Sequence, residues 1–272
     1  MTAALAGRTV VVTGASSGIG AATARHCAAL GARVILLARD AGRLRAVADR
    51  IGPEAEPHAV DLADPDALAA VAARIEADHG TPDVLVNNAG GGRWRFAEET
   101  DPAEARAMMD VPVLAAFHLT RCFLPGMLER GRGTIVTVTS MAAFTPFPGA
   151  TAYVMSRKAL LGLHEALAAD LSGTGVRPVL AYFARVDSLF WANNPGSAER
   201  VPGAQALIPR IDPDRAGRAI ARGVARGRRT VTAPGMARVV RALAALAPGI
   251  TSALVRRTGH RRNNVGRTDA RP

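Results

Sequence analysis

The sequence predicts one α/β domain built on a doubly wound parallel sheet of about seven strands, with helices on both faces. Short runs of valine, isoleucine and leucine alternate along the chain with longer amphipathic segments, a pattern typical of parallel strands joined by right-handed helical crossovers. A glycine-rich stretch at 13–20 separates the first such run from the first helix-like segment. The chain has 272 residues, 49% of them hydrophobic, which is enough to bury one core.

The expected strands are short and rich in β-branched and leucine side chains, as strands buried on both faces are. In chain order they are 9–13, 33–37, 57–61, 84–86, 134–139, 177–183 and 228–232. Ligands of such a sheet bind outside the carboxyl ends of the strands. The segments that directly follow the strands are therefore the places where a site is expected.

The expected helices fill the intervening segments and carry their own boundary signals. They are 21–30, 44–51, 66–78, 103–129, 152–171 and a helix that opens at 213–217. Gly31 ends the first helix, and Asp64 before Pro65 is a helix N-cap. Pro112 and Pro125 should interrupt the long helix, because proline lacks the N–H that a helix interior needs.

The C-terminal part of the chain carries a loop, a helix pair and a basic tail. Residues 189–210 contain several prolines and glycines and predict a mobile substrate loop. Residues 233–255 predict a helical cover over a pocket or a contact in a dimer; the alternative is that leucines and arginines here contact an anionic membrane surface. Residues 256–272 are rich in arginine and predict a disordered tail.

Charge and cysteine content limit the class of function. The net charge is +11 and the only lysine is Lys158, but no aromatic-interleaved basic motif accompanies the arginines, so we expect no nucleic-acid partner. We also expect no signal peptide and no spanning helix, because residues 1–12 lack a basic start and no uninterrupted apolar run approaches ~20 residues. Cys27 and Cys122 lie in apolar helical patterns and predict reduced core thiols and a cytoplasmic location.

The glycine-rich stretch predicts a phosphate-binding turn. Its spacing is Gly14-xxx-Gly18-x-Gly20, and it joins a strand to a helix. Glycines let the backbone approach a pyrophosphate, and the helix N-terminus offers free N–H groups and the positive end of its dipole. Residues 87–90, Asn-Asn-Ala-Gly, follow the fourth expected strand and should lie at the same edge of the sheet.

A third segment completes a known pattern. Ser140 follows the fifth expected strand, and Tyr153 stands thirteen residues later. Together with the glycine-rich turn and residues 87–90, these residues resemble the short-chain dehydrogenase/reductase family over about 8–188. The resemblance implies a Rossmann-fold domain over 1–255, an NAD(P)-dependent oxidoreductase activity, and a homodimer or homotetramer.

The resemblance implies NADP(H) as the cofactor. Family members that select NAD carry an aspartate at the position of Ala38, and those that bind a 2′-phosphate carry an arginine at the position of Arg39. Ser16 would be a second phosphate contact; the alternative is that Arg39 is a surface residue and Asp40 takes the ribose hydroxyls. The implied cofactor-binding residues are Gly14, Ser16, Ser17, Gly18, Ile19, Gly20, Arg39, Asp61, Leu62, Asn88, Ala89, Gly90, Tyr153, Arg157, Val186 and Ser188.

The resemblance also implies a catalytic set of Ser140, Tyr153 and Arg157, without a metal. In the family a tyrosine passes a proton to the carbonyl oxygen as hydride arrives from the nicotinamide, a serine holds that oxygen, and a lysine stabilises the phenolate. Here the residue four after the tyrosine is Arg157, which lies on the same helix face and keeps the positive charge. Lys158 lies about 100° around the helix, so only a local bulge would let it take this role.

Two further positions depart from the family pattern. The asparagine that the family carries in the helix after the fourth strand is Pro112 here, which cannot hold the relay water assigned to that asparagine. After the sixth strand, Arg185 stands where a small residue is expected, and Ser188 would replace the threonine that contacts the nicotinamide amide. These changes spare the phosphate turn, so cofactor binding is a firmer expectation than turnover.

The sequence thus predicts an NADPH-dependent carbonyl reductase or alcohol dehydrogenase that acts on a hydrophobic substrate, with Tyr153 as acid/base. One alternative is an NADP(H)-binding pseudoenzyme that serves as a sensor or scaffold, because lysine and asparagine are lost beside an intact phosphate turn. A second alternative is a redox-neutral enzyme that uses the same pocket for acid/base chemistry.

Overall fold

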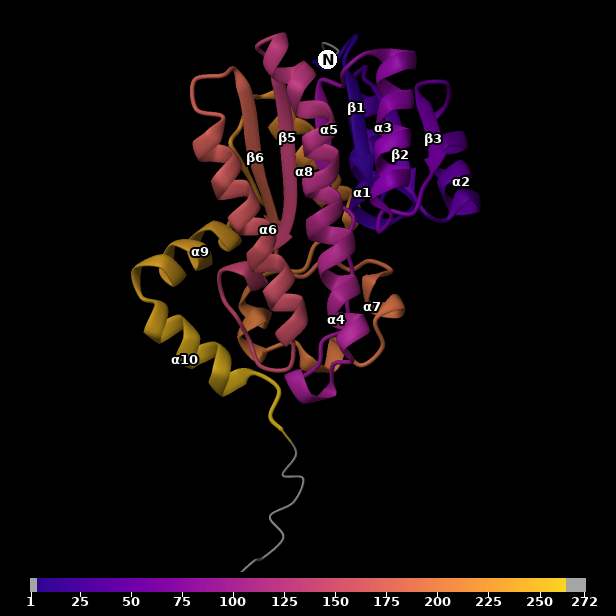
Figure 1. The fold of residues 1–272 in the computed structure, drawn as a ribbon. Coiled ribbons are helices and arrows are strands. Elements are labelled where there is room, and N and C mark those ends of the chain that lie inside the picture. The colour runs from indigo at the N-terminus through magenta and orange to yellow at the C-terminus, as the bar shows by residue number, and fades with distance from the viewer. Residues whose placement is uncertain (1–3, 263–272) are drawn as a thin grey trace, which may run out of the picture.

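A parallel sheet of seven strands, in the order β3-β2-β1-β4-β5-β6-β7, forms the centre of the computed structural model, which describes residues 4–262 (Figure 1). The strands are β1 Thr9–Thr13, β2 Arg33–Ala38, β3 Ala55–Ala59, β4 Val84–Asn87, β5 Gly133–Ser140, β6 Val176–Phe183 and β7 Thr230–Val231. The strand order reverses between β1 and β4, which is where a doubly wound sheet forms its binding crevice. The predicted fold class is confirmed.

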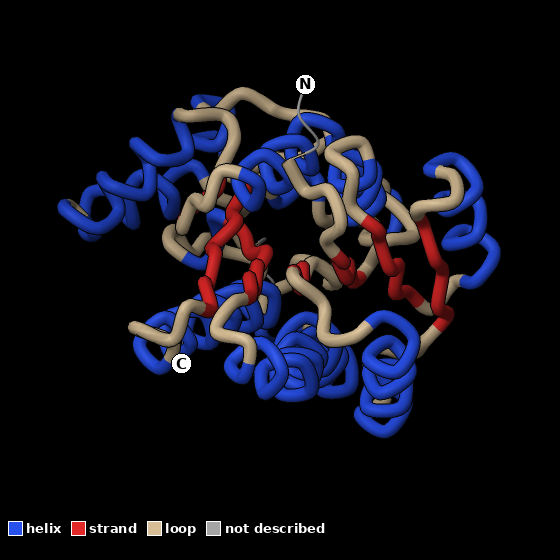
Figure 2. Tube along the Cα trace, turned by 90° about the horizontal axis from the view of Figure 1, so that it is seen from above, coloured by secondary structure: helices blue, strands red, loops and turns tan. Residues whose placement is uncertain are grey.

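Helices cover both faces of the sheet (Figure 2). They are α1 Gly18–Ala28, α2 Ala41–Ile51, α3 Pro65–His79, α4 Pro102–Met109, α5 Ala115–Glu129, α6 Thr151–Asp170, α7 Phe190–Asn193, α8 Pro213–Ala225, α9 Met236–Leu246 and α10 Pro248–Thr258. Helices α1, α2 and α8 pack in one core cluster, and α3, α5 and α6 pack in another. In β1, Val10 and Val12 belong to the first cluster and Val11 to the second, because successive strand residues point to opposite faces.

Element boundaries follow the register of neighbouring strands more than local composition. The third strand begins at Ala55, two residues before its predicted start, because it pairs with β2 from Val34 onward. The seventh strand is reduced to Thr230–Val231, since it lies at the edge of the sheet and pairs only with the middle of β6.

The two prolines of the long helix behave differently. Pro112 lies in a π-helical segment, Asp110–Leu114, between α4 and α5, so the predicted interruption is confirmed there. The prediction that Pro125 interrupts the helix is wrong, because α5 continues through it. Phe123 and Met127 on either side are fully buried, and their packing in the core holds the helix in place across the missing N–H.

The run Pro102–Glu129 is long and apolar enough to cross a membrane by length and composition alone. The expectation of no spanning helix rested on the absence of an uninterrupted apolar stretch, and it stays a prediction. The inner side chains of this run, among them Leu119 and Phe123, belong to the core cluster formed with β1, β4 and β5. Packing against the sheet explains the apolar composition of this helix.

Both predicted core thiols are free. Cys27 is fully buried in α1, and this burial raises the pKa of its thiol to about 12. Cys122 is partly buried in α5, and burial raises its pKa as well. Neither cysteine is therefore set up as a reactive thiolate.

The predicted C-terminal helix pair corresponds to α9 and α10, which lie at one side of the molecule, beyond the end of the sheet (Figure 1). The predicted start of the disordered tail at residue 256 is wrong, because α10 continues to Thr258. The Thr258 hydroxyl accepts a hydrogen bond from the backbone N–H of Ala204 and so ties the last turn of α10 to the loop 189–210. The rest of the predicted tail, from residue 263, lies outside the described residues.

Candidate active site

A cavity of about 390 Å³ lies at the carboxyl ends of β1, β4, β5 and β6, beside the reversal of strand order. The predicted site residues that line it are Gly14, Ser16, Ser17, Gly18, Ile19, Asn88, Ala89, Gly90, Ser140, Tyr153, Arg157, Val186 and Ser188. Gly20, Arg39, Asp61 and Leu62 do not line it. The structure thus brings the three sequence segments, the glycine turn, 87–90 and 140–157, into one site.

The turn after β1, with Gly14 and Gly18, forms a concave backbone surface that side chains would fill, which we call the cradle. Gly14 and Gly18 have positive φ angles of 64° and 56°, which glycine adopts without strain. A Cβ on Gly14 would lie 2.9 Å from the Cα of Ala89. The N-cap residue of α1, Ser17, makes no side-chain cap hydrogen bond, so the first N–H groups of α1 remain free to bind an anion.

Two predicted cofactor residues support the cradle from behind. The side-chain amide of Asn88 donates to the carbonyl oxygen of Thr13 at 2.9 Å, and the Thr13 hydroxyl accepts the Asn88 backbone N–H at 2.9 Å. These bonds hold the turns after β1 and β4 together. A Cβ on Gly20 would lie 2.3 Å from the carbonyl oxygen of Gly14, so this glycine lets α1 approach the turn.

Tyr153 and Arg157 lie on the buried face of α6, with only 8% and 6% of their surface exposed. The guanidinium carbon of Arg157 lies 4.6 Å from the centre of the Tyr153 ring. Lys158 points to solvent, and α6 is regular around it, so the alternative in which a bulge brings Lys158 to the tyrosine is not observed. Ser140, at the end of β5, lines the same cavity and accepts the N–H of Ala142 at 3.2 Å.

Arg157 is fixed against the turn that follows β4. One terminal nitrogen donates to the carbonyl oxygen of Gly91 at 3.3 Å, whereas its Nε is buried and has no hydrogen-bond partner among the described residues. A Cβ on Gly90 would lie 3.0 Å from both terminal nitrogens of Arg157 and 3.0 Å from the Cβ of Pro112. Pro112 and Arg157, two residues that differ from the expected pattern, therefore both lie against Gly90.

These features fit a dinucleotide. The cradle has room for a pyrophosphate against the free N–H groups of α1, and the unpartnered Nε of Arg157 is a donor of the kind that ribose hydroxyls accept. A metal is not required to explain the site, and no group of His, Cys, Asp and Glu within the described residues 4–262 is arranged to hold one.

The sequence pattern of the short chain dehydrogenase family matches residues 8–194. The chain belongs to this family. It is 40% identical to a short chain dehydrogenase of Pseudocercospora fijiensis over 205 residues, which cover 74% of this chain and 62% of that relative. The chain thus spans less than two thirds of that relative's length. The resemblance predicted from the sequence is confirmed.

Solved structures of the family share the fold. A metagenomic short-chain oxidoreductase in complex with NADP is 39% identical, with a TM-score of 0.68 over 82% of this chain and 92% of that protein. A short-chain dehydrogenase from Sphingobium yanoikuyae in complex with NADPH is 27% identical, with a TM-score of 0.75 over 96% of this chain and 99% of that protein.

The short chain dehydrogenase cavity has an aromatic wall that sequence reasoning missed. The ring of Trp94 lies 5.5 Å from that of Tyr153, and Phe190 lies 5.9 Å from Tyr153. Phe147 and Trp191 pack on Trp94 at 4.6 Å and 5.4 Å. The chain has few aromatic residues and only two tryptophans, both of which lie in this wall. Because residues 94 and 191 are far apart in the chain and only the fold brings them together, the sequence alone did not reveal the wall.

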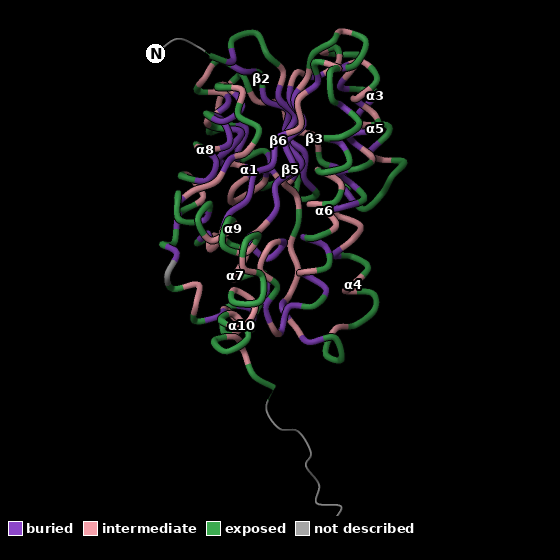
Figure 3. Tube along the Cα trace, turned by 90° about the vertical axis from the view of Figure 1, so that its left-hand side faces the viewer, coloured by how far each residue is buried: buried purple, intermediate pink, exposed green. Residues whose placement is uncertain are grey.

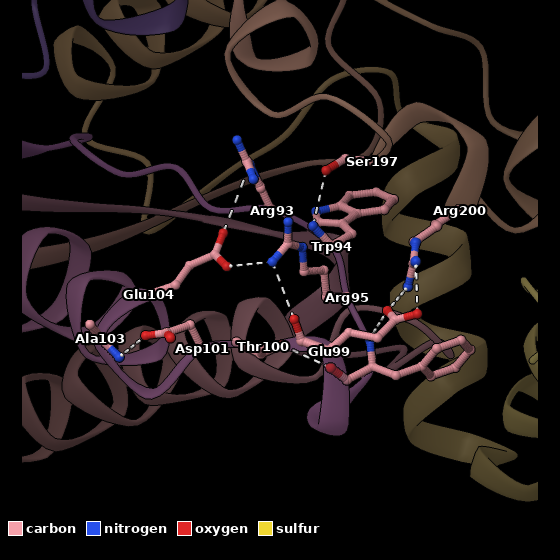
Figure 4. Close-up of polar contacts among 11 residues, drawn as sticks. Arg93, Trp94, Arg95, Glu99, Thr100, Asp101, Ala103, Glu104, Ser197 and Arg200 are labelled. Atoms are coloured by element: carbon pink, nitrogen blue, oxygen red, sulfur yellow. Dashed lines mark hydrogen bonds and ion pairs between the residues drawn. The ribbon is translucent and has the colours of Figure 1, made fainter.

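The segment after β4 and the loop 189–210 are joined by buried hydrogen bonds (Figure 4). The backbone N–H of Trp94 donates to the fully buried hydroxyl of Ser197 at 2.9 Å, and that of Gly92 donates to Asn194 at 3.2 Å. The loop contains α7 and 3₁₀ turns at Ala198–Arg200 and Gly203–Leu207. Because Asn194 and Ser197 are buried, the loop packs as a wall of the cavity, where the sequence predicted a mobile substrate loop.

An ion pair ties the same two segments at the surface, because Arg200 of the loop contacts the carboxylate of Glu99 at 2.6 Å (Figure 4). A second ion pair, between Arg95 and Glu104 at 3.2 Å, joins the segment after β4 to α4. The hydrogen bond from Arg200, helped by the backbone N–H of Phe96, holds the pKa of Glu99 below its usual range. The contact between Arg200 and Glu99 helps to set the position of the loop that carries α7.

Arg185, the third departure, lies beside the aromatic wall. Its guanidinium carbon is 5.0 Å from the centre of the Trp191 ring, and its Nε is 3.7 Å from Asp187. The Ser188 hydroxyl accepts the N–H of Phe190, the first residue of α7, at 3.3 Å. Arg185 thus supports Trp191, at the position where the resemblance implies a small residue.

Three of the predicted residues outside the cavity, Arg39, Asp61 and Leu62, follow the carboxyl ends of β2 and β3. Arg39 is exposed directly after β2, while Asp40 accepts the N–H of Arg43 at 2.9 Å and caps α2. Asp61 accepts the N–H of Ala63 at 3.0 Å. The side chain of Leu62 is buried in the core, so only its backbone could contact a cofactor.

Proposed function

We propose that this protein is an NADPH-dependent oxidoreductase that transfers hydride between the nicotinamide and a carbonyl or alcohol group of a hydrophobic substrate. The observation that carries the proposal is a single cavity lined by the glycine turn and by the stacked pair Tyr153 and Arg157. A glycine turn alone fits many nucleotide-binding proteins, and a buried tyrosine fits many cores. Their juxtaposition at the strand reversal is what favours hydride-transfer chemistry.

The chain's own residues support NADP(H). The free N–H groups at the start of α1 would bind the pyrophosphate, and the Nε of Arg157 would donate to a ribose hydroxyl. Arg39 is exposed beyond β2 and would pair with a 2′-phosphate, whereas Asp40 is engaged in capping α2 and is a weaker candidate for the hydroxyls. Both solved relatives described above were bound to NADP or NADPH. When bound, the cofactor supplies or accepts the hydride.

Three side chains would take part in proton transfer at the oxygen of the substrate. Tyr153 would give a proton to the carbonyl oxygen during reduction and take it back during oxidation. Ser140 would hold the same oxygen through a hydrogen bond. Arg157 would stabilise the phenolate by charge, but it keeps its own proton. The proton that Tyr153 gives up must therefore return from solvent or a hydroxyl group, without passing through Arg157.

The aromatic wall supports a hydrophobic, flat substrate. Trp94 and Phe190 lie 5.5 Å and 5.9 Å from the Tyr153 ring, and Phe147 and Trp191 pack on Trp94 behind them. Aromatic faces and edges at these distances favour aromatic or ring-shaped ligands over extended polar ones. We therefore place aromatic and steroid-like ketones ahead of small polar carbonyl compounds.

We further propose that the protein is cytoplasmic and assembles as a homodimer or homotetramer. Exposed apolar side chains at Leu114, Phe117 and Met155 lie on the outer faces of the π-helical segment, α5 and α6 and would be covered by a second copy. Light scattering on purified protein tests the assembly; a monomer at micromolar concentration would contradict it.

The activity is tested by NADPH binding and NADPH oxidation against a panel of aromatic, steroid-like and long-chain ketones and aldehydes. We expect turnover with at least one aromatic ketone and its loss in Tyr153→Phe, with a much smaller effect on NADPH affinity than on turnover. Tight NADPH binding without oxidation across the panel would favour the pseudoenzyme. Conversion of a substrate without cofactor consumption would favour the redox-neutral enzyme.

A further inference from the structure

Helices α9 and α10 expose a row of large apolar side chains to solvent. In Figure 3 both helices carry stretches coloured as exposed. The row consists of Met236, Val239, Leu243, Leu246, Ile250 and Leu254, and the exposed fraction reaches 84% at Leu246 and 74% at Ile250. Most of the large apolar side chains that the described residues expose belong to this row. Exposed apolar patches of this kind mark contact surfaces.

The row is the outer face of helices that are held on the molecule by another face. In α9, Ala237 is fully buried and Val240 packs on the cluster that contains Tyr182. In α10, Val255 packs against the cluster that contains Trp94. The outward orientation of the row is therefore set by tertiary contacts on the opposite side of each helix.

Arginines flank the row, and only the last of them, Arg262, pairs with an acidic residue of another segment, Glu98, among the described residues. Arg238, Arg256, Arg257 and Arg261 are exposed, and the segment 236–262 contains no aspartate or glutamate. Arg257 lies three residues after Leu254 and seven after Ile250, which places it on the same side of α10 as these apolar residues. The surface thus combines exposed apolar side chains with a net positive charge.

We propose that this row docks α9 and α10 onto the surface of an anionic lipid bilayer. Amphipathic helices with apolar side chains on one side and arginines beside them lie in the interface of anionic membranes. The two helices are bent by 116° relative to each other, so they do not form one continuous span. A second copy of the chain is a poorer occupant, because a two-fold contact through this face would bring arginines of both copies together without acidic partners.

Docking would place the bilayer next to the substrate loop. Helix α10 is tied to the turn Gly203–Leu207 by the bond between Thr258 and Ala204, and Gln205 of that turn lines the cavity. If the proposed function holds, a hydrophobic substrate dissolved in the bilayer would reach the cavity from this side. The docking itself does not depend on the activity and is tested without it.

The test is co-flotation of the full chain with two kinds of vesicle, at low and at high salt. One kind contains phosphatidylcholine alone, and the other contains about 30% phosphatidylglycerol in addition. We expect binding to the anionic vesicles that weakens with salt, and little binding to the neutral ones. Replacing both Arg256 and Arg257 by Gln should lower the partition coefficient about 30-fold. Replacing both Leu246 and Ile250 by Ser should lower it at least about tenfold.

Matched controls separate this surface from overall charge and hydrophobicity. Arg50→Gln with Arg132→Gln removes the same charge from exposed positions on other faces, and Leu128→Ser removes an exposed leucine of α5. These variants should float like the parent protein. Circular dichroism and the unfolding temperature check that each variant is folded, and the two independent replacements keep the test valid if one of them fails to fold.

Three results would overturn the proposal. The first is the absence of flotation with anionic vesicles at low salt. The second is an equal loss in the control variants, which would assign binding to net charge alone. The third is a change of oligomeric state in the Leu246 and Ile250 variant without any vesicle binding by the parent, which would make the row a contact between subunits.

Discussion

The guanidinium of Arg157 lies over the ring of Tyr153, with its central carbon 4.6 Å from the ring centre. The positive charge that the family supplies with lysine is thus present, but it sits against the aromatic face and is held by Gly91 and the glycine at 90. Pro112 reaches the same glycine from the π-helical segment. Pro112 and Arg157 thus form one local cluster around Gly90, in which the guanidinium packs beside a residue without a polar side chain.

We predict that kcat depends more on the positive charge at position 157 than on the shape of the guanidinium. Arg157→Met should lower kcat about 100-fold, because the phenolate of Tyr153 loses its cation, while Arg157→Lys should keep or raise the activity. The exposed neighbour provides the control, and Lys158→Met should leave kcat unchanged. Complete loss in Arg157→Lys, not restored by adding Pro112→Asn, would show that the guanidinium has a dedicated contact.

Arg39 should decide between the two nicotinamide cofactors. Arg39→Asp should raise the Kd for NADPH about 100-fold, because a charge-assisted pair with the 2′-phosphate is lost. The Kd for NADH should change by less than about threefold, since NADH lacks this phosphate. Arg45→Asp, at an exposed position on α2, is the matched charge control. Fluorescence titration gives both constants, and equal losses for the two cofactors would remove the assignment.

Gly14 should be intolerant of a side chain. Gly14→Ala places a Cβ 2.9 Å from the Cα of Ala89 at a φ of +64°, which should cost about 1–2 kcal/mol of stability and weaken NADPH binding. Gly162→Ala is the control, because this exposed glycine in α6 has nothing within 4 Å, and the change should stabilise the protein by about 0.5–1 kcal/mol. Urea unfolding measures both; equal stability of Gly14→Ala and the parent would contradict the cradle geometry.

Asp214 should make the free energy of unfolding depend on pH in the acid range. Burial alone would raise its pKa, but hydrogen bonds from His26, Arg218 and Arg25 outweigh burial and lower the pKa to about 2 from 3.8. Because the folded-state pKa is depressed, the stabilisation is complete above pH 3.8 and is lost as the pH falls through about 2.

The corresponding variant gives the measurement. Asp214→Asn should lower the free energy of unfolding by about 1 kcal/mol at pH 7, a small value because the group is partly exposed, and the difference from the parent should shrink near pH 2.5. Asp170→Asn, an exposed aspartate at the end of α6, should show no such difference. A gap for Asp214→Asn that persists unchanged in acid would show that the contacts do not depend on ionisation.

Local patterns were sufficient for most of the fold. The β-branched run at 9–13, the glycine turn and the cap at Asp64 depend on interactions between residues close in the chain, and each appears where it was predicted. Pro125 shows the limit of this reasoning, because buried neighbours hold α5 together across a residue that local rules would exclude. The start of β3 likewise follows pairing with β2.

Periodicity and spacing along the chain specify the fold class, the phosphate turn and the placement of Tyr153 and Arg157 on one helix face. Three relationships emerge only from packing: Trp94 and Trp191 share a wall, Pro112 and Arg157 meet at Gly90, and one side of α9 and α10 is exposed. These relationships join segments that are far apart in the chain. They depend on how helices and loops pack on the sheet, which no local pattern specifies.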